Sequence, residues 1–229
     1  MNTREELLAA AAKKRAAEAT QRRDRPRARR DTSGAAVSLP HVVARAKIEI
    51  RGEADADTVH YNGFASTYEQ PYEMYDMFGP YTEVVTAGAG AVSLARADLD
   101  VPFVLQHESL RRIARTTNGT LQLSETDHGL EVDAPSLDMR DQDVAYIVPK
   151  LRAGLIDEMS FAFRIQRGMW SPDYTEYRIE EYDIHRGDVA IVGYGANPFT
   201  SGALREADSS HKRGRDLIAP DEIRLFPAI

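Results

Sequence analysis

Residues 155–163 read Leu155-Ile156-Asp157-Glu158-Met159-Ser160-Phe161-Ala162-Phe163. From Met159 onward, bulky apolar side chains alternate with Ser160, Ala162 and then Arg164. This period of two is typical of a strand with one packed face. Ser160 lies near the start of that strand and points away from its bulky neighbours. A nucleophilic serine could stand there if a base reached it, but most strand serines are inert, so the residue by itself favours an inert role.

The composition sets broad limits on the kind of protein. The chain has 229 residues, of which 42% are hydrophobic, which is enough for one large domain or two small ones with a sizeable core. It contains no cysteine, which excludes disulfides and thiolate metal sites and fits a reducing, intracellular setting. No apolar run approaches the roughly 20 residues that span a bilayer, and residues 1–20 lack the apolar segment of a signal peptide. We therefore expect no membrane association.

The charge is distributed unevenly along the chain. Residues 1–31 carry ten Lys or Arg and five Asp or Glu, a net charge of +5, which leaves −12 for the rest of a chain whose total is −7. Residues 3–19 are rich in helix formers, and residues 22–30, which include Pro26, are expected to be disordered. A solvated arm is favoured over a tether to nucleic acid or an acidic protein. No aromatic residues are interleaved for base stacking, so we expect no specific nucleic-acid partner.

Period-two patterns predict seven or eight strands, mostly neighbours in sequence, at residues 44–50, 58–65, 101–107, 120–124, 129–134, 159–164, 177–184 and 188–192. Helices are expected at residues 3–19, around 92–96, and around 144–151, where Asp141 or Asp143 caps the start and Gly154 the end. The tyrosine-rich residues 68–81 are expected to form a loop whose aromatic side chains pack. Adjacent strands joined by hairpins indicate a mostly β fold with peripheral helices (α+β), an antiparallel sheet or barrel.

Four stretches resemble motifs of a known family. They are Gly-Phe-Ala at residues 63–65, the segment 103–108 with His107, the block from 129–132 through 154–163, and residues 188–192 followed by Ala-Asn-Pro at 196–198. In this order they resemble the prohead proteases of tailed phages with HK97-type capsids, relatives of the herpesvirus capsid-maturation proteases. Glu108 replaces the usual aspartate, and Asp188 stands where many members have glutamate. The resemblance covers roughly residues 45–200.

The resemblance implies a serine endopeptidase that acts inside assembling proheads in the host cytoplasm, encoded by a phage or a prophage. Its partners would be the scaffolding protein and the major capsid protein, and it would cut scaffolding segments and its own tails. The implied fold is a herpesvirus-protease-like antiparallel β-barrel, a homodimer, with no cofactor and no metal. The expected division is a basic arm at residues 1–40, a protease domain at 41–202 and a charged tail at 203–229.

The resemblance also suggests the catalytic residues. Ser160 would be the nucleophile, and His107 would be the base that takes its proton, because histidine can accept a proton near neutral pH. Asp188 would orient the imidazole and stabilise its charged form. The alternative third member is His185, since the herpesvirus relatives use a second histidine in that role. His60 and His128 are expected to be loop or surface histidines.

Two other functions stay open from the sequence. One is a catalytically inactive capsid-assembly scaffold protein with the same fold, which would need no triad. The other is a metal hydrolase, although the sequence has no HExxH motif and no paired His/Asp spacing. A serine, a histidine and an acid in family order favour the protease.

Overall fold

The computed structural model describes residues 3–30, 41–45, 49–51 and 57–193. One sheet contains, in spatial order, β1 (His41–Arg45), β10 (Glu158–Trp170), β11 (Glu176–Val192), β5 (Pro80–Val85) and β4 (Tyr72–Tyr75); β6 (Pro102–Leu105) also pairs with β11, and β7 (Arg112–Arg115) pairs with β6. The other sheet contains β2 (Glu49–Arg51), β3 (Thr58–Thr67), β9 (Gly129–Asp138) and β8 (Gln122–Glu125). The expected mostly β, α+β class is confirmed. No closed barrel is seen among the described strands.

The helices are few and lie outside the sheets. They are α1 (Arg4–Glu18), α2 (Ala91–Leu94), α3 (Gln142–Arg152) and the short 3-10 helix η1 (Thr116–Asn118). None of these described helices is long and apolar enough to cross a membrane. Asp141 caps α3 by accepting hydrogen bonds from the Asp143 and Val144 amides at 2.8 and 3.2 Å, and Gly154 follows the helix in the left-handed conformation with φ 64°, as expected.

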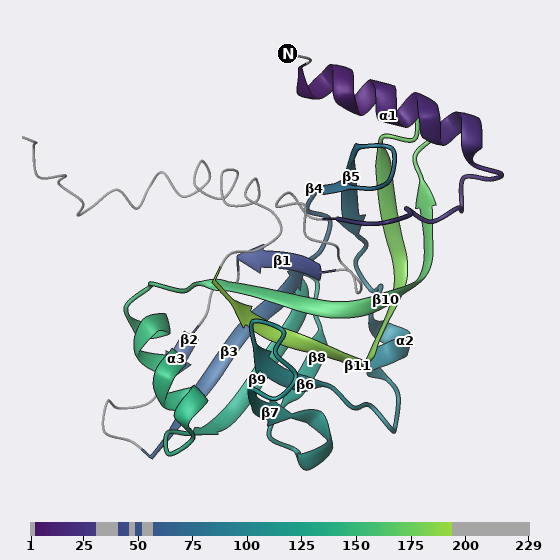
Figure 1. The fold of residues 1–229 in the computed structure, drawn as a ribbon. Helices are drawn as coiled ribbons and strands as arrows, with labels where there is room; N and C mark the ends of the chain where they lie inside the picture. Colours follow the sequence, from purple (N-terminus) through teal and green to yellow (C-terminus); the bar gives the residue numbers. More distant parts are fainter. Residues whose placement is uncertain (1–2, 31–40, 46–48, 52–56, 194–229) are drawn as a thin grey trace, which may run out of the picture.

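Two long antiparallel strands, β10 and β11, join the two parts of the molecule (Figure 1). Their ends near Ser160 lie in the body with β3, β6, β9 and α3. Their other ends, residues 164–170 and 176–183, extend away from the body (Figure 1). There β11 pairs with β5, and α1 lies against β5. We call α1, the segment 19–30, β4, β5 and these strand ends the distal lobe.

The alternation in residues 159–163 forms the centre of the core, as predicted. Met159, Phe161 and Phe163 are fully buried. The Phe161 and Phe163 rings stack with centroids 4.2 Å apart, and Tyr182 meets the Phe161 ring edge-on at 5.2 Å. Burial of these aromatic side chains supplies much of the apolar area that stabilises the body.

Two strand predictions require correction. Residues 177–184 and 188–192 belong to one strand, β11, interrupted by a bulge: Ala162 pairs with Asp188, but Arg164 pairs with Asp183. Residues 68–81 are not a loop, because they include β4 and the start of β5, and Tyr72 and Tyr81 are buried in the core. The predicted hairpin of β8 and β9 is confirmed. The strand expected at residues 44–50 is described as β1 and β2, and residues 46–48 between them lie outside the described residues.

The N-terminal segment differs most from expectation. The predicted helix forms, with Thr3 and Glu6 as a capping box, but residues 22–30 are not disordered. They run along the distal lobe, where the Trp170 amide donates to the Arg22 carbonyl at 2.8 Å and the Met77 amide to the Arg27 carbonyl at 2.9 Å. Arg30 and Tyr75 exchange two backbone hydrogen bonds. The domain boundary at residue 40 remains a prediction, and the tail at 203–229 lies outside the described residues.

Candidate active site

Ser160 lies in the middle of the first sheet. Its Cα pairs with Val43 on β1 and with Ala190 on β11. The residue is 1% exposed, and its Oγ has no hydrogen-bond partner within the described part of the chain. A buried hydroxyl without a partner costs about 1–3 kcal/mol, and a catalytic role is one of the explanations for such a group, as is a bound water.

His107 stands on a tight turn directly after β6. That strand runs parallel to β11, with Leu105 opposite Ile191. Gln106 and His107 then both take the left-handed conformation, with φ values of 52° and 57°. This conformation is uncommon outside glycine, and two in succession reverse the chain sharply. The reversal directs the imidazole toward β11.

The structure brings His107 and Asp188 together. His107 Nδ1 lies 2.6 Å from Asp188 Oδ1, and both side chains are mostly buried. A carboxylate beside Nδ1 favours the tautomer with the proton on that nitrogen, which makes Nε2 the nitrogen that can accept a proton from a hydroxyl.

The strand register relates this pair to the serine. Ala162 lies opposite Asp188, and Ser160 lies opposite Ala190. Side chains at opposed and alternate positions share one face of a sheet, so Ser160 and Asp188 are diagonal neighbours on the same face. Such neighbours lie about 7–8 Å apart. An imidazole held by Asp188 therefore lies on the face of the sheet that carries the serine.

The alternative residue, His185, faces different partners. Its Nδ1 accepts a hydrogen bond from the Asp100 amide at 3.2 Å. Arg115 donates two hydrogen bonds of 2.7 Å to the Asp100 carboxylate and lowers the pKa of that carboxyl. His185 thus anchors the β11 bulge to the segment before β6, whereas Asp188 is the residue in contact with His107.

His60 and His128 have other surroundings. His60 is on β3 rather than in a loop, and its Nε2 lies 2.5 Å from Asp133 Oδ1. His128 is exposed in the turn between β8 and β9, as expected for a surface histidine.

Two residues that the sequence analysis does not single out hold the His107–Asp188 pair in place. The Gln106 amide donates to the Ile191 carbonyl at 2.9 Å, and its side-chain Oε1 accepts from the Gly193 amide at 3.0 Å. Gly187 allows β11 to approach β10, because a Cβ there would lie 1.8 Å from the Ala162 carbonyl oxygen. A glycine directly before the candidate acid was the only sequence signal, and the pairing with β10 was needed to interpret it.

The His107 imidazole is held by a carboxylate, and a buried serine lies on the same face of the sheet. This arrangement suits the chemistry of serine hydrolases. The family model for the caudovirus prohead serine protease matches residues 46–213. The chain belongs to this family of phage capsid-maturation proteases. No curated protein and no solved structure matches the chain.

Proposed function

We propose that this chain is a serine endopeptidase in which Ser160 is the nucleophile, His107 the general base and Asp188 the group that orients the imidazole. The observation that carries the proposal is the 2.6 Å contact between His107 Nδ1 and Asp188 Oδ1. The diagonal placement of Ser160 and its buried, unpartnered hydroxyl support it.

The steps follow from these roles. His107 Nε2 takes the proton from the Ser160 hydroxyl as the oxygen attacks the scissile carbonyl, and Asp188 stabilises the imidazolium. The imidazolium then gives its proton to the leaving amine, and the acyl group stays on Ser160. A water molecule, deprotonated by the same imidazole, hydrolyses the acyl-enzyme and restores the hydroxyl.

The substrates and setting form part of the proposal. By family membership, the enzyme would act in assembling proheads in the host cytoplasm, as a homodimer, on the scaffolding protein or on the scaffolding segment of the major capsid protein. A fold like that of the herpesvirus capsid-maturation proteases is proposed on the resemblance alone. The enzyme would also cut its own tails, which mass spectrometry tests by comparing the wild-type chain with the Ser160→Ala chain purified identically.

Labelling with a fluorophosphonate tests the catalytic assignment. The wild-type chain should be labelled covalently at Ser160, and because this residue is 1% exposed, labelling also tests access to the hydroxyl. Ser160→Ala and His107→Ala should each lose most peptide hydrolysis, and the double variant should lose little more, because the members of a triad act as a unit. His107→Ala with near wild-type hydrolysis would refute the assignment.

The third member and the alternative function are separated by the same assay. Asp188→Asn should impair hydrolysis, though less than Ser160→Ala, while His185→Ala should not; the reverse result would make His185 the third member. A folded wild-type chain that is neither labelled nor active would support the alternative, a catalytically inactive capsid-assembly scaffold.

A further inference from the structure

Five exposed arginines lie within nine residues of the distal lobe. They are Arg22, Arg23, Arg25, Arg27 and Arg30, and we call residues 22–30 the arginine strap. A sixth arginine, Arg29, faces inward, where it pairs with buried Glu83 and donates to the Tyr81 hydroxyl at 3.1 Å. Arg29 therefore anchors the strap to the distal lobe, and the other five arginines are exposed to solvent.

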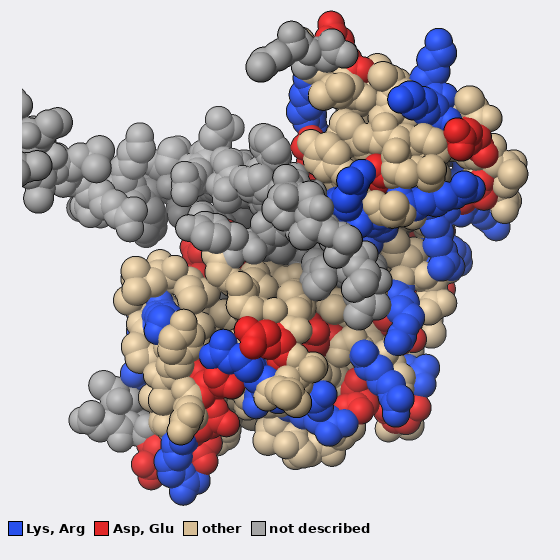
Figure 2. All heavy atoms as spheres, in the orientation of Figure 1, with Lys and Arg blue, Asp and Glu red and all other residues tan. Residues whose placement is uncertain are grey.

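The strap is fixed along its length. Its backbone is bonded to Trp170, Met77 and Tyr75, and Arg29 adds the ion pair to Glu83. Figure 2 shows Lys and Arg side chains gathered over the part of the distal lobe that carries α1 and the strap. A partner that binds here meets cations already held in place, so little backbone entropy is lost on binding.

The outward arginines form no ion pair with an acidic residue in the described part of the chain, although Arg27 lies close enough to Asp24 to help lower the pKa of its carboxyl. Arg22 and Arg25 donate only to the backbone carbonyls of Trp170 and Gln166. Within those same described ranges, no ion pair involves Arg23, Arg27 or Arg30. Other arginines behave differently, since Arg111, Arg115 and Arg140 each pair with an aspartate at 2.6–2.7 Å.

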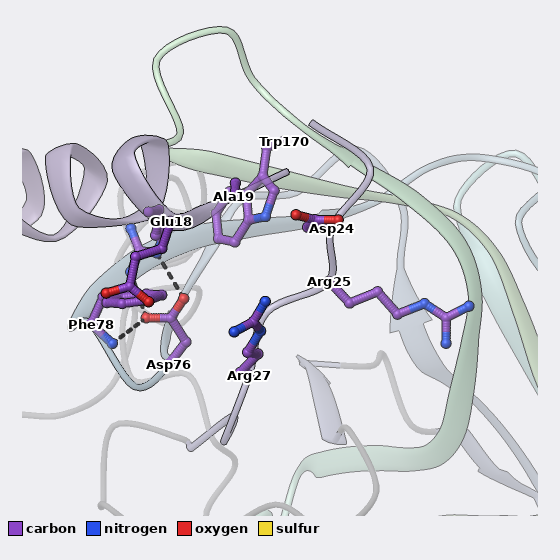
Figure 3. Close-up of a pocket in the computed structure, with 9 residues that line it drawn as sticks. Glu18, Ala19, Asp24, Arg25, Arg27, Asp76, Phe78 and Trp170 are labelled. Carbon is purple, nitrogen blue, oxygen red and sulfur yellow. Dashed lines mark hydrogen bonds and ion pairs between the residues drawn. The ribbon is translucent and has the colours of Figure 1, made fainter. Parts of the chain in front are cut away.

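The one acid in the strap is already engaged. Asp24 accepts hydrogen bonds from the Gln21 and Thr20 amides, which are the main causes that lower the pKa of its carboxyl. Beside it, Arg25 and Arg27 line a small pocket with Trp170 (Figure 3). Glu18, Asp24 and Asp76 line the same pocket, so the excess of positive charge lies in the strap and not in the recess: five exposed arginines stand against the one carboxylate of Asp24.

We propose that the arginine strap binds an acidic polypeptide segment of a prohead component. The strap itself is folded: Arg22 and Arg23 lie in a turn in which the Asp24 amide donates to the Gln21 carbonyl at 3.0 Å, and a bend follows at residues 27–28. A polypeptide is favoured over nucleic acid because the strap has no aromatic residue, Trp170 beside it is buried, and Phe78 in the neighbouring pocket is only partly exposed, whereas binding of single strands relies on successive stacked bases. The partner's identity as a prohead component rests on the proposed function; the binding itself does not.

Fluorescence anisotropy with the full Ser160→Ala chain tests the strap. The probe is a labelled twelve-residue peptide of alternating Glu and Ser. Arg23→Gln/Arg27→Gln should bind it about threefold to tenfold more weakly, given the modest strength of exposed ion pairs. The matched control, Lys13→Gln/Lys14→Gln, removes two exposed cations from the neighbouring α1 and should change binding less than about twofold, as should Arg23→Lys/Arg27→Lys. Added salt should weaken wild-type binding.

The outcomes separate the proposal from its rivals. Equal loss of peptide binding in Arg23→Gln/Arg27→Gln and in Lys13→Gln/Lys14→Gln would overturn the proposal, because binding would then follow net charge alone. A single-stranded oligonucleotide of equal charge that binds more tightly than the peptide, with the same dependence on Arg23 and Arg27, would also overturn it in favour of nucleic acid. Failed fluorophosphonate labelling with intact strap binding would instead refute the protease mechanism and leave the strap in place.

Discussion

Gln106 fixes the turn on which His107 lies. It and His107 are consecutive left-handed residues, and each such conformation costs on the order of 1–3 kcal/mol unless its surroundings enforce it. The two hydrogen bonds from Gln106 to β11 and Gly193 supply that enforcement. Because β11 also carries Asp188, Gln106 fixes the histidine turn to the strand of its partner.

We predict that Gln106→Ala lowers kcat about tenfold with little change in KM, because the imidazole loses its fixed orientation while peptide binding persists. Gln106→Glu keeps an oxygen that can accept from the Gly193 amide and should recover most activity. Gln106→Asn tolerates the left-handed backbone but is too short to reach, so it should resemble Gln106→Ala. Steady-state peptide hydrolysis measures all three, with exposed Gln122→Ala as control.

A different result would assign another role to Gln106. Full activity of Gln106→Asn together with low activity of Gln106→Ala would show that the backbone conformation matters and the side-chain hydrogen bond does not.

At the scale of elements, the bulge in β11 determines which acidic residue meets His107. Residues 184–187 lie between Asp183, which pairs opposite Arg164, and Asp188, which pairs opposite Ala162. The bulge changes the register of the strand, as bulges near functional sites commonly do. His185, inside the bulge, is directed to Asp100, while Asp188, just after it, reaches His107.

Gly187→Ala should displace the bulge, because the new methyl group would meet the Ala162 carbonyl, a backbone atom that cannot easily move. We expect peptide hydrolysis to fall at least about a hundredfold, since small misplacements of catalytic groups have effects of this size, and stability to fall by about 1–3 kcal/mol. Gly193→Ala is the control, because its new Cβ would lie 3.7 Å from its nearest neighbour, the Gln106 side-chain nitrogen Nε2. Wild-type activity in folded Gly187→Ala would contradict this role for the bulge.

At the scale of the whole molecule, a buried ion pair holds the N-terminal helix to the distal lobe. Arg15 donates to both oxygens of Asp76 at 2.7 and 2.9 Å and to the Gly79 and Pro80 carbonyls at 2.8 Å. Arg15 and Asp76 are 2% and 1% exposed. A charge this deeply buried must keep its partner, since water cannot replace it.

Arg15→Ala should therefore lower the free energy of unfolding by about 3–5 kcal/mol, because it leaves the Asp76 charge buried and unpaired. Lys14→Ala, at the neighbouring exposed position of α1, should change it by less than about 0.5 kcal/mol. Urea denaturation of both variants measures the difference. An unchanged midpoint for Arg15→Ala would mean that residues 1–30 behave as the separable arm that the charge pattern predicts.

The sequence by itself determined the features that depend on neighbouring residues. The alternation around Ser160, the β8–β9 hairpin and the capped helix α3 were predicted correctly because side-chain periodicity and capping act within a few residues. The three candidate residues were also named from the sequence, through the order of four short motifs. Their catalytic roles remain predictions, although the structure places His107 against Asp188.

Only the tertiary structure decided which distant residues meet. Arg15 and the arginine strap have the composition of a solvated arm. Nothing near them in sequence reveals that Arg15 pairs with buried Asp76 and Arg29 with buried Glu83, each more than 50 residues away. The alternating pattern breaks at residues 185–187, so it predicts two strands, but pairing with the continuous β10 maintains the single strand β11. In each case the local pattern reflects only the preferences of a side chain in water or beside its sequence neighbours. The burial of the arginines and the continuity of β11 depend on contacts that form only when the chain folds.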